Sequence, residues 1–188
     1  QSFIMKKLTL FEPLFQELRI RQILPHLPRG GVFVDIGCDQ PQVLIDRVSE
    51  EMKTCIGLDS VVEPHAYKNV KILHQDLKKK ITLPSNSADV ITILAVLEHM
   101  KHPNEIIGEC FRILKPGGVL LITAPSPASK PLLELFAILG LVRKEMIEQH
   151  ENYFTVKRLH TLMKKTGFSE VTVDLFELGC NTFCKAVK

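Results

Sequence analysis

Residues 31–41 read Gly-Val-Phe-Val-Asp-Ile-Gly-Cys-Asp-Gln-Pro, and the rest of the chain is organised around this stretch. The apolar run Val32–Ile36 has the length of a buried strand, Gly37 ends it with a turn, and a helix is expected from Pro41. A strand, a tight turn and a helix form the nucleotide-binding corner of doubly wound α/β domains, because a helix N-terminus offers free N–H groups. Only one glycine of the usual set is present, so the motifs that follow decide the interpretation.

Composition narrows the class of protein. The chain has 188 residues, of which 45% are hydrophobic and 24% charged, and its formal net charge is +3. These values are typical of one soluble globular domain, and so small a net charge does not indicate a nucleic-acid-binding surface. The five cysteines are scattered and contain no Cys-x-x-Cys pair, so we expect neither a metal site nor a disulfide framework. This cysteine usage fits a reducing cytoplasm best, so a cytoplasmic location is expected. No signal peptide is recognisable at the start of the sequence.

Short apolar runs alternate with amphipathic stretches, which indicates a mainly parallel sheet with helical crossovers. We expect strands at 32–36, 54–59, 69–74, 88–96 and 119–124, and a terminal hairpin of 170–176 with 182–187. We expect helices at 11–24, at 41–51, from Pro103 onward, and at 155–165 with a cap at Gly167. In the first helix Leu14, Leu18 and Ile23 fall near one face, and Asp89 is expected to have a structural role at the entrance of its strand.

Six short segments follow one another in a recognisable order. They are Val-Phe-Val-Asp-Ile-Gly-Cys (32–38), Ile-Gly-Leu-Asp (56–59), Gln-Asp-Leu (75–77), Leu-Pro-x-x-x-Ala-Asp-Val-Ile-x-x-x-x-Val-Leu-Glu-His (83–99), Ile-Leu-Lys-Pro-Gly-Gly-Val-Leu-Leu-Ile (113–122) and Gly-Phe (167–168). Together they resemble the class I S-adenosylmethionine-dependent methyltransferases, of the type 11-like kind, closely over 31–125 and more loosely over 150–188.

The resemblance implies an α/β fold with a Rossmann-like, doubly wound, seven-stranded and mostly parallel sheet that ends in an antiparallel hairpin. It also implies S-adenosyl-L-methionine as the cofactor. We expect a single domain over 1–188. Its parts are an N-terminal helical segment (1–30), a cofactor-binding core (31–125), a lid or substrate segment (126–150), and a C-terminal helix with the hairpin (151–188).

Two acids follow strands at the positions where this family binds the nucleoside. By the resemblance, Asp59 would accept hydrogen bonds from the ribose hydroxyls, and Asp76 from the adenine amino group beside the Leu77 N–H. Leu94 and Ala95 would lie under the methionine part. The resemblance also places in the cofactor site Asp35, Gly37, Cys38, Asp39 and Ser60. The alternative role for both Asp59 and Asp76 is to stabilise a turn or cap a helix.

The loop after the first strand departs from the family pattern of acid-x-Gly-x-Gly-x-Gly. It has Asp39 and Pro41 where glycines are usual, and neither residue can both approach a ligand closely and take a positive φ as glycine does. Asp39 or Gln40 is expected as N-cap, with Pro41 as the first helical residue. The Asp39 carboxylate could contact the ammonium group of the cofactor, which we favour, or it could replace a ligand anion and weaken binding.

Methyl transfer from a sulfonium is an in-line displacement, so alignment of the reactants can supply most of the rate. A nucleophile that starts protonated also needs a base. His99, after the fourth strand, and His150, near the C-terminal part, are the candidates, although each could be structural or an ordinary loop residue. Glu98 and Tyr153 are weaker candidates.

The acceptor is open at this point. The apolar run within 131–142 could be a packed helix, a lid over an apolar substrate, or a helix on a membrane surface, and it is too short to span a bilayer. The His-x-x-Tyr-Phe-Thr pattern at 150–155 and the Gly-Cys-Asn turn at 179–181 resemble methyltransferases that act on surface-polysaccharide, lipid-linked or quinone-type acceptors. The acceptor is therefore expected to be a small molecule, or linked to a glycan or lipid.

Two other functions compete with this interpretation. The altered loop could belong to a degenerate methyltransferase-like domain that binds a partner without turnover. The pair Tyr153-x-x-x-Lys157 matches the catalytic pair of short-chain dehydrogenases. Those enzymes also carry a Gly-x-x-x-Gly-x-Gly turn that this chain lacks, so we interpret the match as chance.

Overall fold

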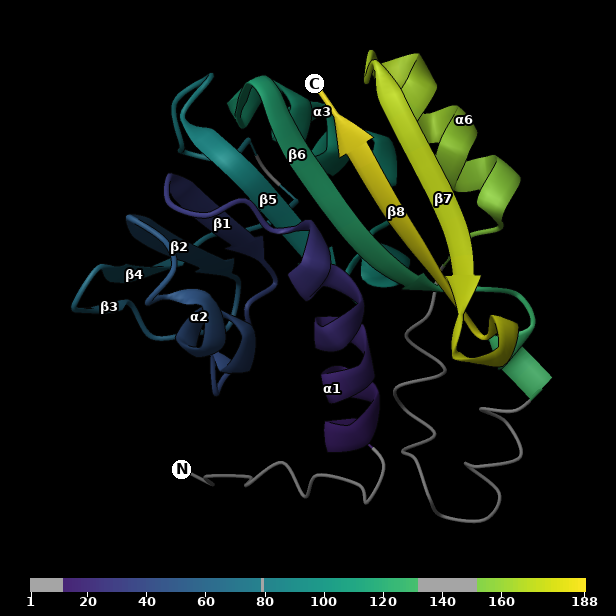
Figure 1. Ribbon diagram of the computed structural model, residues 1–188, viewed down its shortest axis with the longest axis horizontal. Coiled ribbons are helices and arrows are strands. Elements are labelled where there is room, and N and C mark those ends of the chain that lie inside the picture. Colours follow the sequence, from purple (N-terminus) through teal and green to yellow (C-terminus); the bar gives the residue numbers. More distant parts are fainter. Residues whose placement is uncertain (1–11, 79, 132–151) are drawn as a thin grey trace.

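An eight-stranded sheet forms the centre of the computed structural model, which describes residues 12–78, 80–131 and 152–188 (Figure 1). Its spatial order is β3-β4-β2-β1-β5-β6-β8-β7. The strands are β1 (Val32–Ile36), β2 (Thr54–Asp59), β3 (His65–Tyr67), β4 (Val70–His74), β5 (Ala88–Leu94), β6 (Leu114–Pro125), β7 (Glu170–Phe176) and β8 (Asn181–Val187).

The five strands from β4 to β6 in this order are parallel, and the sheet is antiparallel at both ends. β1 pairs in parallel with β2 and β5, β2 with β4, and β5 with β6. β8 runs antiparallel to both β6 and β7, which confirms the terminal hairpin. The carboxyl ends of the parallel strands therefore meet at one edge of the sheet, the usual place for a ligand in an open α/β fold.

β3 is the eighth strand, and the sequence did not predict it. It contributes three residues that pair antiparallel with β4, and its His65 and Ala66 side chains are exposed. A strand this short at a sheet edge buries too little apolar surface to produce a recognisable pattern. The expected arrangement of the other seven strands is confirmed.

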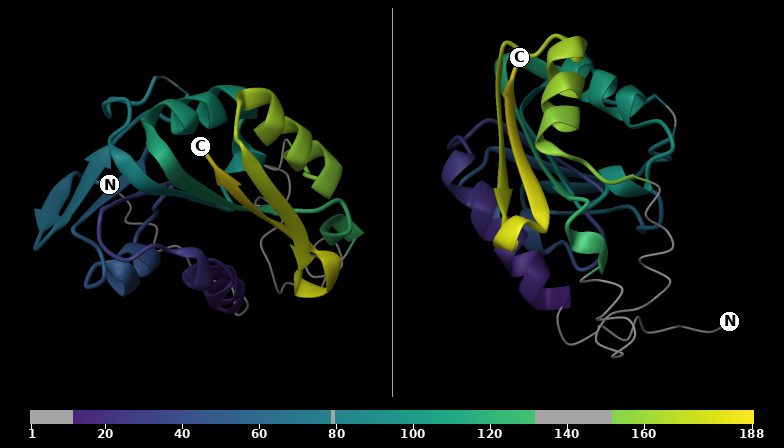
Figure 2. Two further views of the ribbon diagram at one scale, coloured as in Figure 1. Left: turned by 45° about the horizontal axis from the view of Figure 1, so that its top comes forward. Right: turned by 90° about the vertical axis from the view of Figure 1, so that its right-hand side faces the viewer.

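Helices cover both faces of the sheet (Figure 2). α1 (Glu12–Ile23) and α2 (Val43–Val48) lie on one face, and α3 (Pro103–Ile113) and α6 (Val156–Thr166) lie on the other. Each pair of helices packs its apolar side chains into a separate core cluster with the residues of the sheet face beneath it. The central strands are buried on both faces, which explains their nearly continuous apolar sequence.

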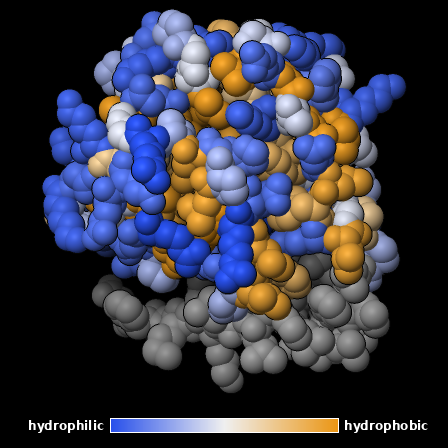
Figure 3. All heavy atoms as spheres, viewed as in Figure 1, coloured by the Kyte–Doolittle hydropathy of each residue, from blue (hydrophilic) through white to orange (hydrophobic). Residues whose placement is uncertain are grey.

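The buried face of α1 differs from the expectation at Leu14 and Leu18, whereas Ile23 is buried as expected. Leu14 and Leu18 are 50% and 37% exposed, whereas Ile20 and Ile23 are fully buried against the sheet. Apolar residues occur around most of this helix, so their spacing did not single out one face. Figure 3 shows apolar surface on the face of the molecule that carries α1, where polar side chains interrupt it.

Three further boundaries differ from the predicted ones. α2 begins at Val43 rather than Pro41, because residues 39–42 form a turn, described below. β5 ends at Leu94, since Ala95 takes a positive φ of 53° that breaks the strand. β6 begins at Leu114, immediately after α3, with a register shift in its pairing to β5.

The predicted start of α3 at Pro103 and the predicted end of α6 at Gly167 are confirmed. Pro103 is the first residue of α3, where its missing N–H is no loss. Thr155 is the N-cap of α6, and its hydroxyl oxygen accepts a hydrogen bond of 3.1 Å from the Arg158 N–H. Gly167 ends α6 with a φ of 115°, a left-handed conformation that favours glycine.

Candidate functional site

The turn after β1 requires Gly37. Its φ is 78°, and a Cβ atom at this position would lie 2.2 Å from a methyl group of Val96. The turn therefore packs directly against the segment that follows β5. Asp35, two residues earlier, is 5% exposed and accepts a hydrogen bond of 2.6 Å from the Thr92 hydroxyl of β5.

Asp39 takes the backbone conformation that a glycine would otherwise supply. Its φ is 49°, and aspartate is among the residues that tolerate this left-handed region best. The structure thus shows one of the two properties of glycine at this position, the positive φ, while the Asp39 side chain is exposed. The Asp39 carbonyl accepts a hydrogen bond of 2.8 Å from the side-chain amide of Gln42, which ties the turn together.

Neither Asp39 nor Gln40 caps α2. Gln42 is the N-cap residue and makes no side-chain cap bond, and the Val43 N–H donates to the Pro41 carbonyl at 2.9 Å. Helical bonding starts with the Asp46 N–H, which donates to the Gln42 carbonyl. The turn thus uses the residues that were expected to start the helix, and α2 is a short helix of 6 residues.

Asp59 joins two loops at the end of β2. It is 8% exposed, and one carboxylate oxygen accepts from the Val61 N–H at 2.9 Å. The other oxygen accepts from the Asp39 N–H at 3.1 Å. The turn-stabilising role is therefore real, and each oxygen still has capacity to accept a further hydrogen bond from a ligand. Ser60, the next residue, is exposed.

Asp76 follows β4, the neighbour of β2 in the sheet. Its carboxylate accepts a hydrogen bond of 3.0 Å from the Lys78 N–H, and its side chain is half-buried. Gln75 is buried and supports this loop, because its amide donates to the Asp76 carbonyl at 3.0 Å and its oxygen accepts from Thr82. Leu77 is buried beside them. Asp59 and Asp76 thus lie at the carboxyl ends of adjacent parallel strands.

Leu94 and Ala95 lie at the same edge, at the end of β5. Both are half-buried, and the Ala95 N–H donates to the Thr123 carbonyl of β6 at 3.0 Å. The ends of β1, β2, β4 and β5 therefore bring together the residues predicted to bind the cofactor. The contacts with a bound molecule stay a prediction.

Burial raises the pKa values of two side chains at this edge, Asp35 and Cys38. Removal from water, together with the nearby Asp59 charge, raises the pKa of Asp35 to about 7, against the lowering effect of the Thr92 hydrogen bond. Burial and the same acids raise the pKa of the Cys38 thiol to about 12. Cys38 is thus a neutral thiol at physiological pH and not a nucleophile. All five cysteines are free thiols in the structure.

Of the two histidines predicted as bases, the structure describes only His99. His99 ends η2 (Leu97–His99), the short helix after β5, and its side chain is exposed. His150 lies outside the described residues, as does most of the 131–142 segment. Tyr153 is half-buried, and its carbonyl accepts a hydrogen bond of 2.8 Å from Arg158.

Glu98, predicted from the sequence only as a weaker candidate base, is a buried acid with a raised pKa. It is 2% exposed, and burial raises its pKa to about 7. The Asn152 N–H donates to its backbone carbonyl at 3.1 Å. Glu98 lies in η2, a few residues after the end of β5. Its burial could not be predicted from the sequence, because the next residue, His99, is exposed.

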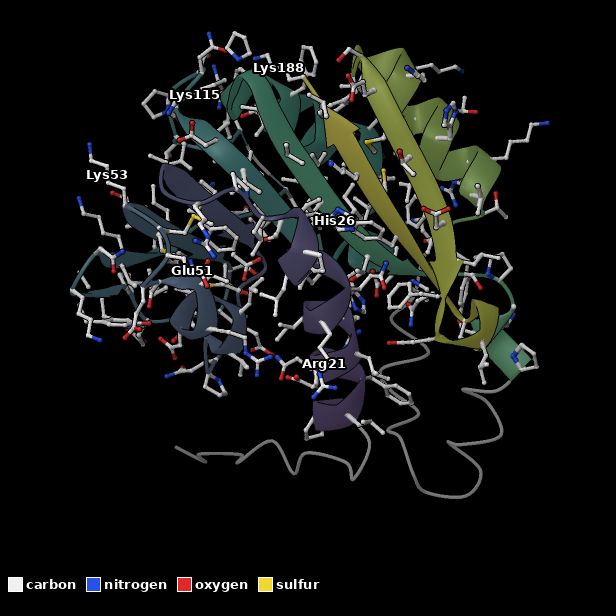
Figure 4. All side chains as sticks on the ribbon, in the orientation of Figure 1. Arg21, His26, Glu51, Lys53, Lys115 and Lys188 are labelled. Carbon is white, nitrogen blue, oxygen red and sulfur yellow. The ribbon has the colours of Figure 1, made fainter. Side chains whose placement is uncertain are left out.

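Asp89 has the structural role predicted for it. Its carboxylate accepts a hydrogen bond of 2.7 Å from the Val32 N–H and forms an ion pair of 2.7 Å with Lys115. Figure 4 shows Lys115 at the end of the sheet where β6 begins, away from the carboxyl edge. Among the described residues, no cluster of three or more His, Cys, Asp or Glu side chains could hold a metal ion. In the same part of the chain, no helix combines the length and apolar character needed to cross a membrane.

Comparison with known proteins supports one family. The sequence model of the family described as "Methyltransferase domain" matches residues 10–173. A protein of Mycolicibacterium smegmatis, named as a probable S-adenosylmethionine-dependent methyltransferase, is 33% identical over 112 residues, which cover 57% of this chain and 43% of the relative. The chain thus spans less than half the length of that relative.

A second relative and a solved structure cover more of the chain. The ubiquinone biosynthesis O-methyltransferase of Vibrio parahaemolyticus is 26% identical, over 91% of this chain and 83% of its own. The crystal structure of a SAM-dependent methyltransferase from Archaeoglobus fulgidus has a TM-score of 0.70 at 18% identity, and covers 93% of this chain and 94% of its own. At that identity, the solved structure supports the fold alone.

Proposed function

Because this chain belongs to the class I S-adenosylmethionine-dependent methyltransferases, we propose that it transfers the methyl group of S-adenosylmethionine to a small-molecule acceptor. The observation that carries the proposal is the placement of Asp59 and Asp76. Both acids follow adjacent parallel strands and lie at the carboxyl edge beside the β1 turn. This edge is where open α/β sheets bind their ligands.

The hydrogen-bonding groups at this edge fit the nucleoside part of S-adenosylmethionine. Asp59 offers two carboxylate oxygens that each hold one backbone N–H and can accept another donor, which suits two ribose hydroxyls. Asp76 offers an acceptor for an adenine amino group, and Leu77 adds a backbone N–H and an apolar side chain. In this proposal the turn-stabilising bonds also fix the Asp59 carboxylate for its ligand.

The methionine part would lie over the β1 turn and the end of β5. Gly37, Cys38 and the Leu94–Ala95 pair would supply close backbone and apolar contact there. The exposed Asp39 carboxylate would meet the ammonium group, with the buried Asp35 adding negative charge behind the turn. An ionised carboxylate and an ammonium group attract each other strongly when close.

The chemistry demands little beyond alignment. The nucleophile attacks the methyl carbon opposite the sulfur, and the site contributes mainly by positioning both reactants. His99 is close in sequence to the end of β5 and has an exposed ring that could take a proton from the nucleophile. His150 stays a second candidate from the sequence alone.

For the acceptor, we propose a small molecule or a lipid-linked or glycan-linked molecule. A relative with 26% identity is a ubiquinone biosynthesis O-methyltransferase, which supports an acceptor of this general class. The 131–142 segment remains the proposed lid or membrane-surface contact.

A non-catalytic binding domain is the alternative, and the Asp39 carboxylate is the feature that favours it. Negative charge in this loop would weaken cofactor binding if the carboxylate of the ligand lies nearer than its ammonium group.

The proposal is tested by following labelled methyl groups. The protein is incubated with methyl-tritiated S-adenosylmethionine and a small-molecule extract of bacterial cells, and the label is counted after separation into organic and aqueous phases. We expect protein-dependent label in the organic phase. Label in the aqueous phase alone would favour a glycan or other polar acceptor. Binding of the cofactor without transfer to either phase would contradict the enzyme and support the binding domain.

A further inference from the structure

A short segment of the chain, residues 152–155, links the ends of β5 and β6 at the carboxyl edge. Its Phe154 N–H donates a hydrogen bond of 3.0 Å to the carbonyl of Pro125, the last residue of β6. Its Asn152 binds η2, the short helix that follows β5. Phe154 is fully buried and Thr155 caps α6, so the segment is anchored where it enters that helix.

Asn152 holds η2 by two carbonyl groups, one on each side of His99. The Asn152 backbone N–H donates to the Glu98 carbonyl at 3.1 Å, and its side-chain amide donates to the Met100 carbonyl at 2.7 Å. A helix of three residues leaves its last carbonyl groups without partners of its own. Asn152 supplies donors for the two that flank His99, so one residue fixes the backbone that carries this histidine.

Arg158 determines which way the side-chain amide of Asn152 points. Its guanidinium group donates to Oδ1 of Asn152 at 2.6 Å and to the Tyr153 carbonyl at 2.8 Å. The same group lies 4.5 Å from the centre of the Phe154 ring, which adds a cation–π contact. Because a guanidinium group only donates, Asn152 turns its oxygen to Arg158 and its NH₂ group to Met100. The positive charge also polarises the amide and strengthens the bond on its other side.

The position of His99 matters because this residue is proposed to take the proton of the nucleophile. In that step the acceptor atom forms a bond to the methyl carbon, and the bond from that carbon to sulfur breaks with its electron pair left on sulfur. The proton of the acceptor passes to the neutral imidazole of His99 and later to water. A misplacement of about 1 Å can lower the rate of such a step by about 100-fold.

We propose that Asn152 is a positioning residue for methyl transfer, which fixes η2 and with it His99, and that Arg158 holds the Asn152 amide in the orientation that this requires. This inference rests on the proposed methyltransferase function and deepens it. The residues proposed to bind the nucleoside, Asp59 and Asp76, follow other strands. Loss of the Asn152 contacts should therefore slow the transfer while the cofactor still binds.

The test uses Asn152→Asp, Arg158→Ala and the control Lys157→Ala. Asn152→Asp keeps an oxygen that accepts from Arg158, but it presents a second oxygen instead of a donor to the Met100 carbonyl. Arg158→Ala removes the group that orients the amide, and Lys157 is an exposed neighbour on the same helix. Thermal unfolding and calorimetric titration with S-adenosylhomocysteine show that each variant is folded and has wild-type affinity for the product.

Hydrogen exchange measures whether η2 is held. The backbone N–H groups of His99 and Met100 both donate to carbonyl groups one turn earlier in η2. In Asn152→Asp these two groups should exchange about fivefold faster than in the wild type, because the lost hydrogen bond makes η2 easier to open. Exchange in β1 should not change, and Lys157→Ala should exchange like the wild type throughout.

The rate of label transfer to the cell extract, at saturating S-adenosylmethionine, measures the effect on the reaction. Asn152→Asp and Arg158→Ala should transfer label about tenfold more slowly or worse, and Lys157→Ala at the wild-type rate. Millimolar guanidinium chloride should restore part of the rate of Arg158→Ala, because the ion can take the vacated place beside Phe154. It should not restore Asn152→Asp.

A double-mutant cycle links the effect to His99. In a His99→Gln protein the proton acceptor is already lost, so the further change Asn152→Asp should slow the transfer little. A purely structural role of Asn152 would instead give the same loss in both backgrounds.

Wild-type exchange of the His99 and Met100 N–H groups in Asn152→Asp would overturn the inference, and so would a wild-type transfer rate in this variant. Equal losses in the two backgrounds of the cycle would overturn the link to His99, and failure of guanidinium to restore Arg158→Ala would overturn the role of Arg158. Absence of S-adenosylhomocysteine binding or of transfer by the wild type would contradict the proposed function itself. The exchange measurement, which needs no acceptor, keeps these two failures apart.

Discussion

At the scale of single residues, three acidic side chains lie around the β1 turn, at the edge proposed to bind the cofactor. Asp35 is buried behind the turn, Asp59 holds the turn in place, and Asp39 presents its carboxylate to solvent. The position of Asp59 at the end of a strand could be predicted from the sequence, because the apolar pattern marks where the strand ends. The hydrogen bond that the Asp59 carboxylate accepts from the Asp39 N–H could not be predicted, because it depends on a turn in which Asp39 has a positive φ.

The first prediction concerns Asp59→Asn. The asparagine keeps one oxygen that can accept a hydrogen bond from the backbone. Alanine would remove both turn hydrogen bonds, so a loss of ligand binding could not be told apart from a change in folding. Loss of charge-assisted hydrogen bonds to the ribose should weaken S-adenosylhomocysteine binding by about tenfold or more. Calorimetry measures this change, and thermal unfolding shows whether the variant is folded. A folded variant with wild-type affinity would remove Asp59 from the cofactor site.

The second prediction concerns Asp39→Asn, which deletes the charge and tolerates the positive φ equally well. If the carboxylate holds the ammonium group, S-adenosylmethionine should bind more weakly to this variant. Close opposite charges near a protein surface interact by up to a few kcal/mol, so the change should be measurable in the same titration. Tighter binding would mean that Asp39 occupies an anion site, and would favour the non-catalytic domain.

The third prediction follows from the pKa of Asp35, which is raised to about 7 from an ordinary 3.8. Between these two values the folded protein binds more protons at this group than the unfolded chain does. The contribution of Asp35 to stability is therefore full below about pH 4 and declines as the pH rises to 7. Each pKa unit corresponds to about 1.4 kcal/mol.

Asp35→Asn should flatten this decline, because asparagine keeps an oxygen for the Thr92 hydroxyl and carries no charge. Urea unfolding of the wild type and the variant at several pH values between 4 and 8 measures the difference. An identical pH dependence in the two proteins would show that Asp35 ionises normally in the folded state.

At the scale of elements, the helices and strands with a clear sequence pattern could be predicted. Boundaries and buried faces that depend on contacts with other segments could not. The buried parallel strands and both ends of α6 carry clear patterns in sequence. The start of α2 depends on the bond from the Gln42 side chain to the Asp39 carbonyl. The buried face of α1 depends on which isoleucines meet the sheet, and several faces of that helix looked equally apolar.

The fourth prediction tests the N-cap of α6. Thr155→Ala removes the oxygen that accepts from the Arg158 N–H, and should lower the free energy of unfolding by about 1 kcal/mol. Thr161→Ala, on an exposed position within the same helix, is the matched control and should change stability much less. Urea unfolding measures both. Equal effects of the two substitutions would show that the cap bond does not stabilise the helix.

At the scale of the whole molecule, the order of the strands in the sheet assembles the proposed cofactor site. Asp35, Asp59, Asp76 and Ala95 are spread over the first half of the chain, and parallel pairing brings the strand ends that carry them to one edge. The family motifs were sufficient to predict this assembly. The burial of Glu98 was not predictable, because it depends on packing between segments far apart in sequence, such as the one that carries Asn152.

The most direct test of the central claim is a calorimetric titration of the wild-type protein with S-adenosylmethionine and then with S-adenosylhomocysteine. The account predicts that both bind to one site, and that the product competes with the cofactor and binds at least comparably. Absence of binding for both ligands at millimolar concentration, in protein shown to be folded by its thermal transition, would contradict it.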